Sequence, residues 1–201
     1  MKKALLLFCF VLAGGLAVSG ASEPNAIRDK LGRDTTLQSF PCARGDVWFY
    51  PDGALDQCTL SRSATVGDLR IPRGSVIELW PDGGARYLVL RRAGLLAGYR
   101  VRGGTRLALV RGATTAFYRT GELRSFYLME NQAIQGVPCR GGAWNTFADP
   151  NGSENQVELY PNGSLESCTL SRGYDNFPGG RRVVLAEPGN NTEVAKTAAA
   201  Q

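Results

Sequence analysis

The sequence "PCARGDVWFYPDGALDQCTLSR" at residues 41–62 returns in two pieces near the other end, as "PCRGG" at 138–142 and "LYPNGSLESCTLSR" at 159–172. Both copies combine a Pro-Cys pair, an aromatic residue before an Asp-Gly or Asn-Gly turn, and the phrase "CTLSR". Asp-Gly and Asn-Gly between alternating apolar residues are strong β-hairpin signals, because tight hairpin turns need positive φ angles. The repetition therefore predicts a fold built from repeated hairpins.

Two further stretches follow the same pattern once the chain is aligned on the turn glycines. Each reads as an apolar strand, an aromatic residue, two turn residues, a glycine and an alternating strand. The four stretches are "VWFYPDGALDQCTLSR" (47–62), "IELWPDGGARYLVLRR" (77–92), "TAFYRTGELRSFYLME" (115–130) and "VELYPNGSLESCTLSR" (157–172). We therefore expect an all-β protein of tandem antiparallel β-hairpin repeats that form an extended or curved sheet.

Strand parity predicts the turn length and the faces of the sheet. A two-residue turn at Asp52-Gly53 pairs Val47 with Cys58 and keeps the apolar residues of both strands on one face. Equivalent turns are expected at 82–83, 120–121 and 162–163. The expected core column is Cys58, Leu60, Leu88, Leu90, Phe126, Leu128, Cys168 and Leu170, and the opposite face is expected to carry the pairs Tyr50–Leu55, Trp80–Ala85, Tyr118–Leu123 and Tyr160–Leu165.

The first 21 residues have the layout of a secretory signal peptide. Lys2 and Lys3 precede an apolar stretch from Leu5 to Leu16, and a small-residue cleavage site ends at Ala21. The alternative is a membrane anchor, which needs about 20 apolar residues. We expect an exported protein, periplasmic, outer-membrane-associated or secreted, with no transmembrane segment after cleavage.

The rest of the chain divides by composition into three parts. Residues 22–36 are expected to form a polar lead-in with at most a short helix, and residues 37–185 the hairpin-repeat domain. Residues 186–201, "AEPGNNTEVAKTAAAQ", have the composition of a disordered tail. The turn glycines are 30, 38 and then 42 residues apart. Extra strand or loop material is therefore expected at 98–112 and 145–155.

Four cysteines remain after the signal peptide, and an even number in an exported chain favours disulfides. The first and last units have both a Pro-Cys entry and a strand cysteine, whereas the two middle units lack both. This joint presence predicts the local pairs Cys42–Cys58 and Cys139–Cys168, which would staple both ends of the sheet. The alternatives are pairing between the end units, 42 with 139 and 58 with 168, and free thiols buried in the core.

The chain resembles variant MORN-type repeat proteins, the YwqK-like exported bacterial family. The resemblance rests on the aromatic-x-x-Asn/Asp-Gly-x-Leu units and on the linking phrases "FPCARG", "IPRG" and "VPCRGG", over residues 37–172. The third unit departs from the pattern with Arg119-Thr120 at its turn. The resemblance implies hairpin repeats, and it implies no enzyme activity and no catalytic residues.

Candidate residues for catalysis or metal binding are few. The chain has no histidine, so an ordinary Ser or Cys triad and the commonest metal ligand are both missing. Asp52, Asp82 and Asn162 are explained as turn formers, and Asp149 is expected in a loop. We expect no cofactor, no metal site and no catalytic site.

The formal net charge of +5 is too small to indicate nucleic-acid binding, and no recognition motif is present. The middle units are nevertheless rich in arginine. These residues are explained either as exposed strand positions that prevent aggregation or as a site for an acidic polymer or anionic lipid. They are Arg91, Arg92, Arg100, Arg102, Arg106 and Arg111.

The aromatic residues before the four turns, Tyr50, Trp80, Tyr118 and Tyr160, form the candidate contact face. They either stabilise their own hairpins or form a ladder of rings that binds glycan or an extended peptide. We interpret the chain as an exported non-catalytic repeat module for binding or structural interaction in the cell envelope. Its partner would be an unknown envelope protein or glycan. The alternative is a small secreted hydrolase or enzyme inhibitor that uses loop residues.

Overall fold

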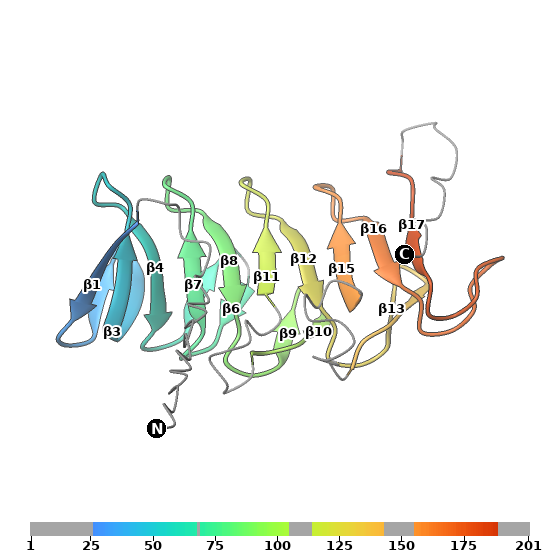
Figure 1. The fold of residues 1–201 in the computed structure, drawn as a ribbon, viewed down its shortest axis with the longest axis horizontal. Helices are drawn as coiled ribbons and strands as arrows, with labels where there is room; N and C mark the ends of the chain where they lie inside the picture. Colours follow the sequence, from blue (N-terminus) through green and yellow to red (C-terminus); the bar gives the residue numbers. More distant parts are fainter. Residues whose placement is uncertain (1–25, 68, 105–113, 143–154, 189–201) are drawn as a thin grey trace, which may run out of the picture.

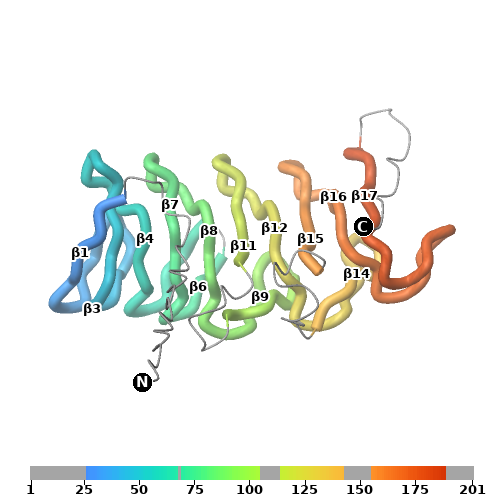
Figure 2. Tube along the Cα trace, viewed as in Figure 1, coloured from blue at the N-terminus to red at the C-terminus, as the bar shows by residue number. Residues whose placement is uncertain are grey.

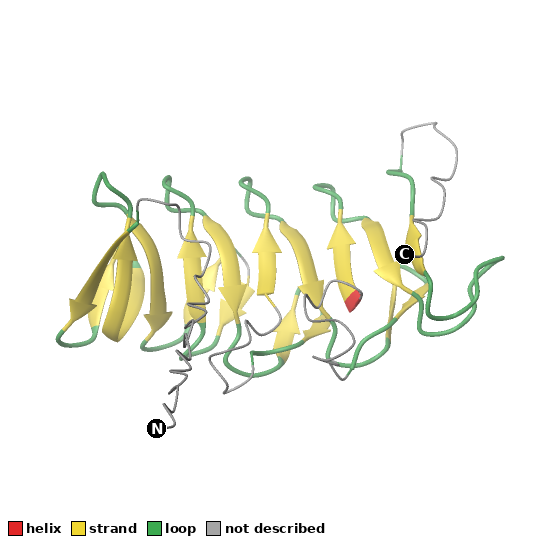
Figure 3. Ribbon diagram, in the orientation of Figure 1, coloured by secondary structure: helices red, strands yellow, loops and turns green. Residues whose placement is uncertain are grey.

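The computed structural model describes residues 26–67, 69–104, 114–142 and 155–188, and the elements named within these ranges are all β-strands. They form one 11-stranded antiparallel sheet and three two-stranded sheets. Figures 1 and 3 show the long sheet as a row of strands with hairpin turns along one end. The predicted all-β architecture of tandem antiparallel hairpins is confirmed.

The strands of the long sheet follow one another almost in chain order. The order is β1 (Ile27–Leu31), β3 (Phe40–Phe49), β4 (Leu55–Leu60), β7 (Val76–Leu79), β8 (Ala85–Val89), β11 (Thr114–Phe117), β12 (Leu123–Tyr127), β15 (Gln156–Leu159), β16 (Leu165–Thr169) and β17 (Arg182–Val184), and β2 (Thr35–Leu37) pairs with the start of β3.

A second series of small hairpins alternates with the hairpins of the long sheet. They are β5 (Ala64–Val66) with β6 (Leu69–Ile71), β9 (Gly94–Leu96) with β10 (Tyr99–Val101), and β13 (Gln132–Ile134) with β14 (Val137–Cys139). The pair of β2 with the start of β3 is the first member of the series. Each repeat thus holds two hairpins, where the sequence had predicted one hairpin and a linker.

The small hairpins of the third and fourth repeats have tight two-residue turns with positive φ angles. The φ angles are 49° at Ala97 and 82° at Gly98, and 50° at Gln135 and 87° at Gly136. Positive φ at both turn positions matches the right-handed twist of the flanking strands. The two-residue turn that the sequence predicts for the large hairpins therefore occurs in the small ones.

The large hairpins turn at the predicted sites, but their loops have three residues. In the first, the Tyr50 amide donates to the Ala54 carbonyl and the Gly53 amide donates to the Tyr50 carbonyl. Gly53 has a φ of 87°, which places it in the left-handed conformation that ends such a loop. The prediction of two-residue turns in the large hairpins is therefore wrong. Figure 2 shows the four loops along one end of the sheet.

A β-bulge after each loop restores the strand pairing. Phe49 pairs with Leu55 and Trp48 pairs with Gln57, so Asp56 is an extra residue in β4. The equivalent extra residues in the later hairpins are Arg86, Arg124 and Glu166.

The bulge also changes which residues reach the core. Val47 pairs with Cys58 and the predicted core column is buried, with each member at 2% exposure or less. The predicted pairs on the opposite face are wrong, because the extra residue turns Leu55 and its equivalents toward the core. Those equivalents, also buried in the core cluster, are Ala85, Leu123 and Leu165.

The small hairpins cover this apolar face of the long sheet. Ile71, Val101 and Ile134 are fully buried in the same core cluster as the strand residues. The Tyr99 ring stacks on Phe126 with 5.0 Å between ring centroids. The core therefore lies between the long sheet and the row of small hairpins.

The prediction of a polar lead-in with at most a short helix is wrong, because β1 lies within residues 22–36 and β2 begins there. All five residues of β1 pair with β3, although its sequence carries three consecutive charged residues. Charges on an edge strand discourage pairing with another chain. The predicted signal peptide and nearly all of the predicted tail lie outside the described residues.

Both predicted disulfides are confirmed. Cys42–Cys58 and Cys139–Cys168 have Cα atoms 5.7 Å apart in each case. The pairing between end units and the free-thiol alternative are therefore excluded. Within the described residues, no helix is long and apolar enough to cross a membrane.

Candidate functional site

The four predicted rings lie at the same place in successive repeats, directly after β3, β7, β11 and β15. Each ring residue opens the three-residue loop and donates its backbone amide across that loop. Tyr50 is buried, whereas Trp80, Tyr118 and Tyr160 are partly exposed. We call the four rings the aromatic row.

The tyrosines of the aromatic row connect each repeat to the next. The Tyr50 hydroxyl donates to the Leu79 carbonyl at 2.7 Å, and the Tyr118 hydroxyl donates to the Leu159 carbonyl at the same distance. The Tyr160 hydroxyl donates to the Leu185 carbonyl at 2.8 Å. Leu79 and Leu159 each directly precede the next ring of the row, and Leu185 follows the last strand, so these three rings have a structural role.

Trp80 is the exception in the row. Its indole nitrogen is enclosed and has no hydrogen-bond acceptor in the described part of the chain. The loops of the second and third large hairpins are joined instead by an ion pair between Asp82 and Arg119, with 2.9 Å between the charged atoms. Trp80 is therefore the member of the row whose side chain makes no hydrogen bond to the next repeat within the described residues.

Arginines lie against the exposed rings. The Arg86 guanidinium lies 4.6 Å from the centre of the Trp80 ring, and the Arg119 guanidinium lies 6.0 Å from the centre of the same ring. Arg124 lies 5.8 Å from the Tyr118 ring. Guanidinium groups over aromatic faces gain cation–π attraction, which holds both groups in place.

Two carboxylates lie near the groups that surround Tyr50 and Arg86. Asp56 is the bulge residue of β4, and Glu78 pairs with the neighbouring residue Gln57. Asp56 is fully buried, and Glu78 lies 3.6 Å from Arg86. The sequence did not indicate this cluster, because strand parity placed Asp56 in a regular strand and did not predict the bulge.

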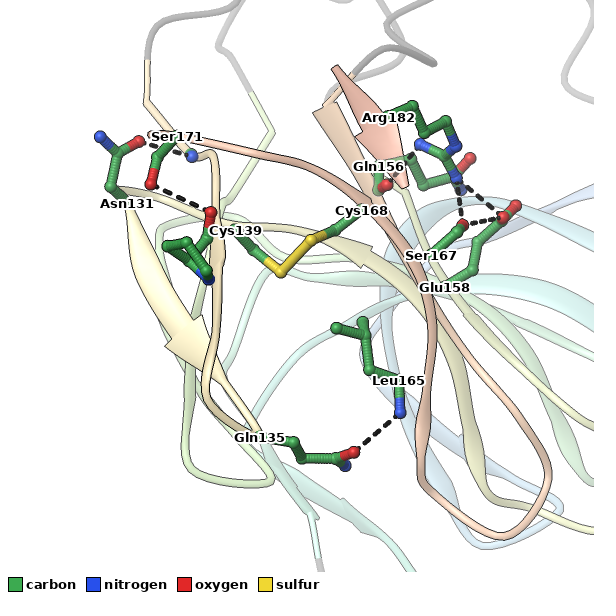
Figure 4. The surroundings of a disulfide bond; sticks show 12 residues. Asn131, Gln135, Cys139, Gln156, Glu158, Leu165, Ser167, Cys168, Ser171 and Arg182 are labelled. Carbon is green, nitrogen blue, oxygen red and sulfur yellow. Dashed lines mark hydrogen bonds and ion pairs between the residues drawn. A yellow bond between two sulfur atoms is a disulfide. The ribbon is translucent and has the colours of Figure 1, made fainter. Parts of the chain in front are cut away.

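A related cluster occupies the fourth repeat and the last strand. Arg182 on β17 donates to Glu158 at 2.7 Å, to the Ser167 hydroxyl at 2.6 Å and to the Gln156 carbonyl at 2.8 Å. Figure 4 shows this group near the Cys139–Cys168 disulfide. Arg182 thereby ties β17 to β16 and to β15 beyond it.

The surroundings of these groups shift their acid–base behaviour. Burial, together with the nearby Asp56 carboxylate, raises the pKa of Tyr50 to about 12. Burial raises the pKa of Glu166, and the nearby Glu158 adds to the effect. Burial alone would raise the pKa of Glu158, but hydrogen bonds and charge from Ser167 and Arg182 lower it below its usual range.

The remaining candidates are separate from the aromatic row. Arg91 and Arg92 are exposed in the loop after β8, while Arg100 forms a 3.0 Å ion pair with Glu130. Arg102 donates to the Gly142 carbonyl. Asp149, Arg106 and Arg111 lie outside the described residues, and within those residues no cluster of three or more Asp, Glu, Cys or His could hold a metal ion.

The chain matches no protein-family model, no curated protein and no solved structure. The resemblance to the MORN-type repeats therefore stays a prediction.

Proposed function

We propose that this protein is an exported, non-catalytic repeat module that binds a protein or glycan of the cell envelope. Its contact surface is the partly exposed part of the aromatic row, Trp80, Tyr118 and Tyr160, with Trp80 as its centre. Tyr50, which the sequence had placed on the candidate contact face, is buried and does not belong to this surface. Two buried disulfides support export, because such bonds persist in oxidising compartments.

The observation that carries the proposal is the difference between Trp80 and the three tyrosines. The tyrosine hydroxyls are engaged by the next repeat, so those rings are held in fixed positions along the row. Trp80 has no such bond, is partly exposed, and has the guanidinium groups of Arg86 and Arg119 near its ring. A large, partly exposed ring that flanking side chains hold in place has the properties of a binding hot spot.

The neighbouring groups give the surface both hydrogen-bond donors and a charge. Arg119 is exposed beside Trp80 and forms an ion pair with Asp82. A hydrogen-bond acceptor of a ligand can replace Asp82 as a partner of this guanidinium. Sugar rings and peptide planes both stack on aromatic faces and accept hydrogen bonds from guanidinium groups. These are the reasons for expecting a glycan or an extended peptide at this place.

The test is capture from a cell-envelope fraction by the immobilised mature chain, residues 22–201. Proteins are identified by mass spectrometry and glycans by their sugar composition. Trp80→Ala is expected to reduce the captured partner on the order of tenfold or more, as the loss of a hot-spot ring does. The urea midpoint should stay close to that of the unmodified chain.

Trp48→Ala is the matched control, because Trp48 is also partly exposed on the long sheet but lies outside the aromatic row. It should leave the captured partner unchanged. Tyr118→Phe keeps the ring and removes the hydroxyl, so it should weaken stability and leave binding intact. Equal capture by the Trp80→Ala variant would remove the aromatic row as the contact surface.

A further inference from the structure

The charges of this protein are separated between two parts of the fold. We define the hairpin layer as the small hairpins with the loops that join them to the long sheet, residues 32–44, 61–67, 69–75, 90–104, 129–142 and 171–181. It contains 12 arginines and three acidic residues, Asp34, Glu130 and Asp175, which gives 12 − 3 = +9. The other described residues contain six basic and ten acidic side chains, which gives 6 − 10 = −4.

The arginines of the hairpin layer are mostly without acidic partners. Arg100 has an ion pair with Glu130, and within the described residues it is the one member of the twelve that pairs with an acidic side chain. Repulsion among so many like charges opposes folding unless they meet an anion. A net charge of +5 for the whole chain conceals this separation.

The repeats place these arginines at recurring positions. Arg62, Arg92 and Arg172 occupy the same loop position, two residues beyond the buried leucine that ends the alternating strand in their repeats. Arg70 and Arg100 both lie on the second strand of a small hairpin, opposite Thr65 and Leu95. Neighbouring repeats are two strands apart, or about 10 Å. The positive charges therefore recur along the length of the array.

A groove lies between the second and third small hairpins. It has a volume of about 390 Å³ and is lined by Arg70 and Arg92, with Ser63, Pro72 and Leu95 among the other lining residues. Both arginines are exposed, and Leu95 at the groove is 68% exposed. The groove thus combines two guanidinium groups with a small apolar wall, a composition suited to one charged sugar ring.

The residue type also limits the ligand. Every basic residue of the hairpin layer is arginine, although the chain contains lysine elsewhere. The planar guanidinium group binds carboxylate, sulfate and phosphate groups through two parallel hydrogen bonds. The spacing of about 10 Å between repeats is close to the length of a disaccharide in an extended polysaccharide.

We propose that the hairpin layer binds an extended acidic polysaccharide, with one acidic sugar in the groove between Arg70 and Arg92. The polymer runs along the array and contacts arginines of successive repeats. The proposal concerns a different surface from the aromatic row and does not depend on it. A bilayer would instead contact exposed apolar side chains, and within the hairpin layer the large ones are Leu95 and Met129.

The test uses the mature chain and a fluorescent oligogalacturonate long enough to span three repeats. Binding is measured by fluorescence anisotropy at low and at physiological salt. The affinity should fall steeply with salt, because each guanidinium–carboxylate contact is screened. Arg70→Glu with Arg92→Glu should lower the affinity at low salt on the order of tenfold or more.

The matched control reverses the same number of charges in the other part of the fold. Arg28→Glu with Lys30→Glu, at two exposed positions of β1, changes the net charge equally and should leave the affinity within about twofold. Trp80→Ala should also leave it unchanged, which separates this surface from the aromatic row. A neutral glucan oligosaccharide should show no binding.

Three outcomes would overturn the proposal. The first is no binding of oligogalacturonate above that of the neutral glucan. The second is an equal loss in both charge-reversal variants, which would mean that net charge alone attracts the polymer. The third is stronger binding to phosphatidylglycerol vesicles than to the oligosaccharide, with loss of vesicle binding in Leu95→Asp, which would assign the layer to a membrane surface.

Discussion

The end repeats and the middle repeats fill the same place in the core with different chemistry. In the first repeat Cys42 is bonded to Cys58, and in the fourth Cys139 is bonded to Cys168. The small-hairpin register places Ile71 and Val101 at the position of the first cysteine of each pair, and the strand register places Leu88 and Phe126 at the position of the second. All eight residues are buried to 1% exposure or less.

The difference follows from the position of each repeat in the array. A middle repeat packs against a neighbour on both sides, whereas an end repeat has one such neighbour and buries less apolar surface. A disulfide restricts the unfolded chain and does not depend on a neighbouring repeat. Covalent bonds at the ends and large apolar side chains in the middle are therefore two ways to hold one repeated site together.

The largest expected effect comes from removing the apolar filling of a middle repeat. Phe126→Ala should lower the free energy of unfolding by about 3–5 kcal/mol, because it deletes a fully buried ring that stacks on Tyr99. Urea unfolding followed by circular dichroism measures the change. Leu95→Ala is the control and should cost little, because this side chain is 68% exposed. A loss below that of Leu95→Ala would show that the middle core is not packed as described.

The disulfides of the end repeats should contribute slightly less. The chain-entropy relation gives about 3 kcal/mol for the loop of Cys42–Cys58 and about 3.5 kcal/mol for the longer loop of Cys139–Cys168. The sequence separations are 16 and 29 residues. Paired Cys→Ala variants of each bond, unfolded in urea, give the two values.

A second pair of variants sharpens the comparison by giving an end repeat the residues of a middle one. Cys42→Ile with Cys58→Leu copies the filling of the second repeat. Part of the lost free energy should return relative to the alanine pair, because the methyl groups refill the cavity. No recovery would mean that the end sites have a different shape from the middle ones.

In the aromatic row the second repeat differs from the other three, because the third repeat also has a tyrosine whose hydroxyl bonds to the next repeat. Tyr50 ties the first repeat to the second through the Leu79 carbonyl, whereas Trp80 makes no such bond. Tyr50→Phe should cost about 1 kcal/mol at neutral pH by removing this bond. The pKa of Tyr50 is about 12 in the folded protein, above the ordinary value of 10.0.

The raised pKa also predicts a loss of stability in alkali. The folded state holds the Tyr50 proton more tightly than the unfolded state, so this contribution is complete below pH 10 and is lost as the pH rises through about 12. An absorbance titration of the tyrosines should show a late step near pH 12 from Tyr50, and this step should vanish in Tyr50→Phe. An unchanged late step would assign it to another ring.

Repetition and parity in the sequence predicted much of this fold. The joint presence of cysteines in the end repeats predicted both disulfides, and alternation predicted the buried column from Cys58 to Leu170. Parity failed at the turns, because one extra loop residue and one bulge residue cancel and leave the far pairs, such as Val47 with Cys58, unchanged. The apolar pattern tests only pairs that lie away from the turn, so it could not detect the extra loop residue and the bulge residue that compensate for each other.

The small hairpins were missed for a different reason. Their strands have three residues each, and their turns use Gln38-Ser39 or Gln135-Gly136, which are weaker signals than Asn-Gly or Asp-Gly. Without them, the arginines appeared as scattered exposed positions. The separation of charge becomes visible when each arginine is assigned to a layer of the fold.

The smallest predicted effect is at Thr115, where the third repeat departs from the others. The equivalent first-strand positions hold Val47, Ile77 and Val157, all fully buried in the core. Thr115 is also fully buried, and its hydroxyl has no hydrogen-bond partner in the described part of the chain. A buried hydroxyl without a partner costs free energy, since it gives up its bonds to water on folding.

Thr115→Val replaces this hydroxyl with a methyl group of similar size and gives the third repeat the residue of the first and fourth. The variant should be more stable than the unmodified chain by about 1 kcal/mol. Urea unfolding at neutral pH measures the change, and Thr65→Val, at an exposed position of a small hairpin, is the control that should change little. A loss of stability in Thr115→Val would mean that the hydroxyl has a partner in the folded protein and that the third repeat is built differently from its neighbours.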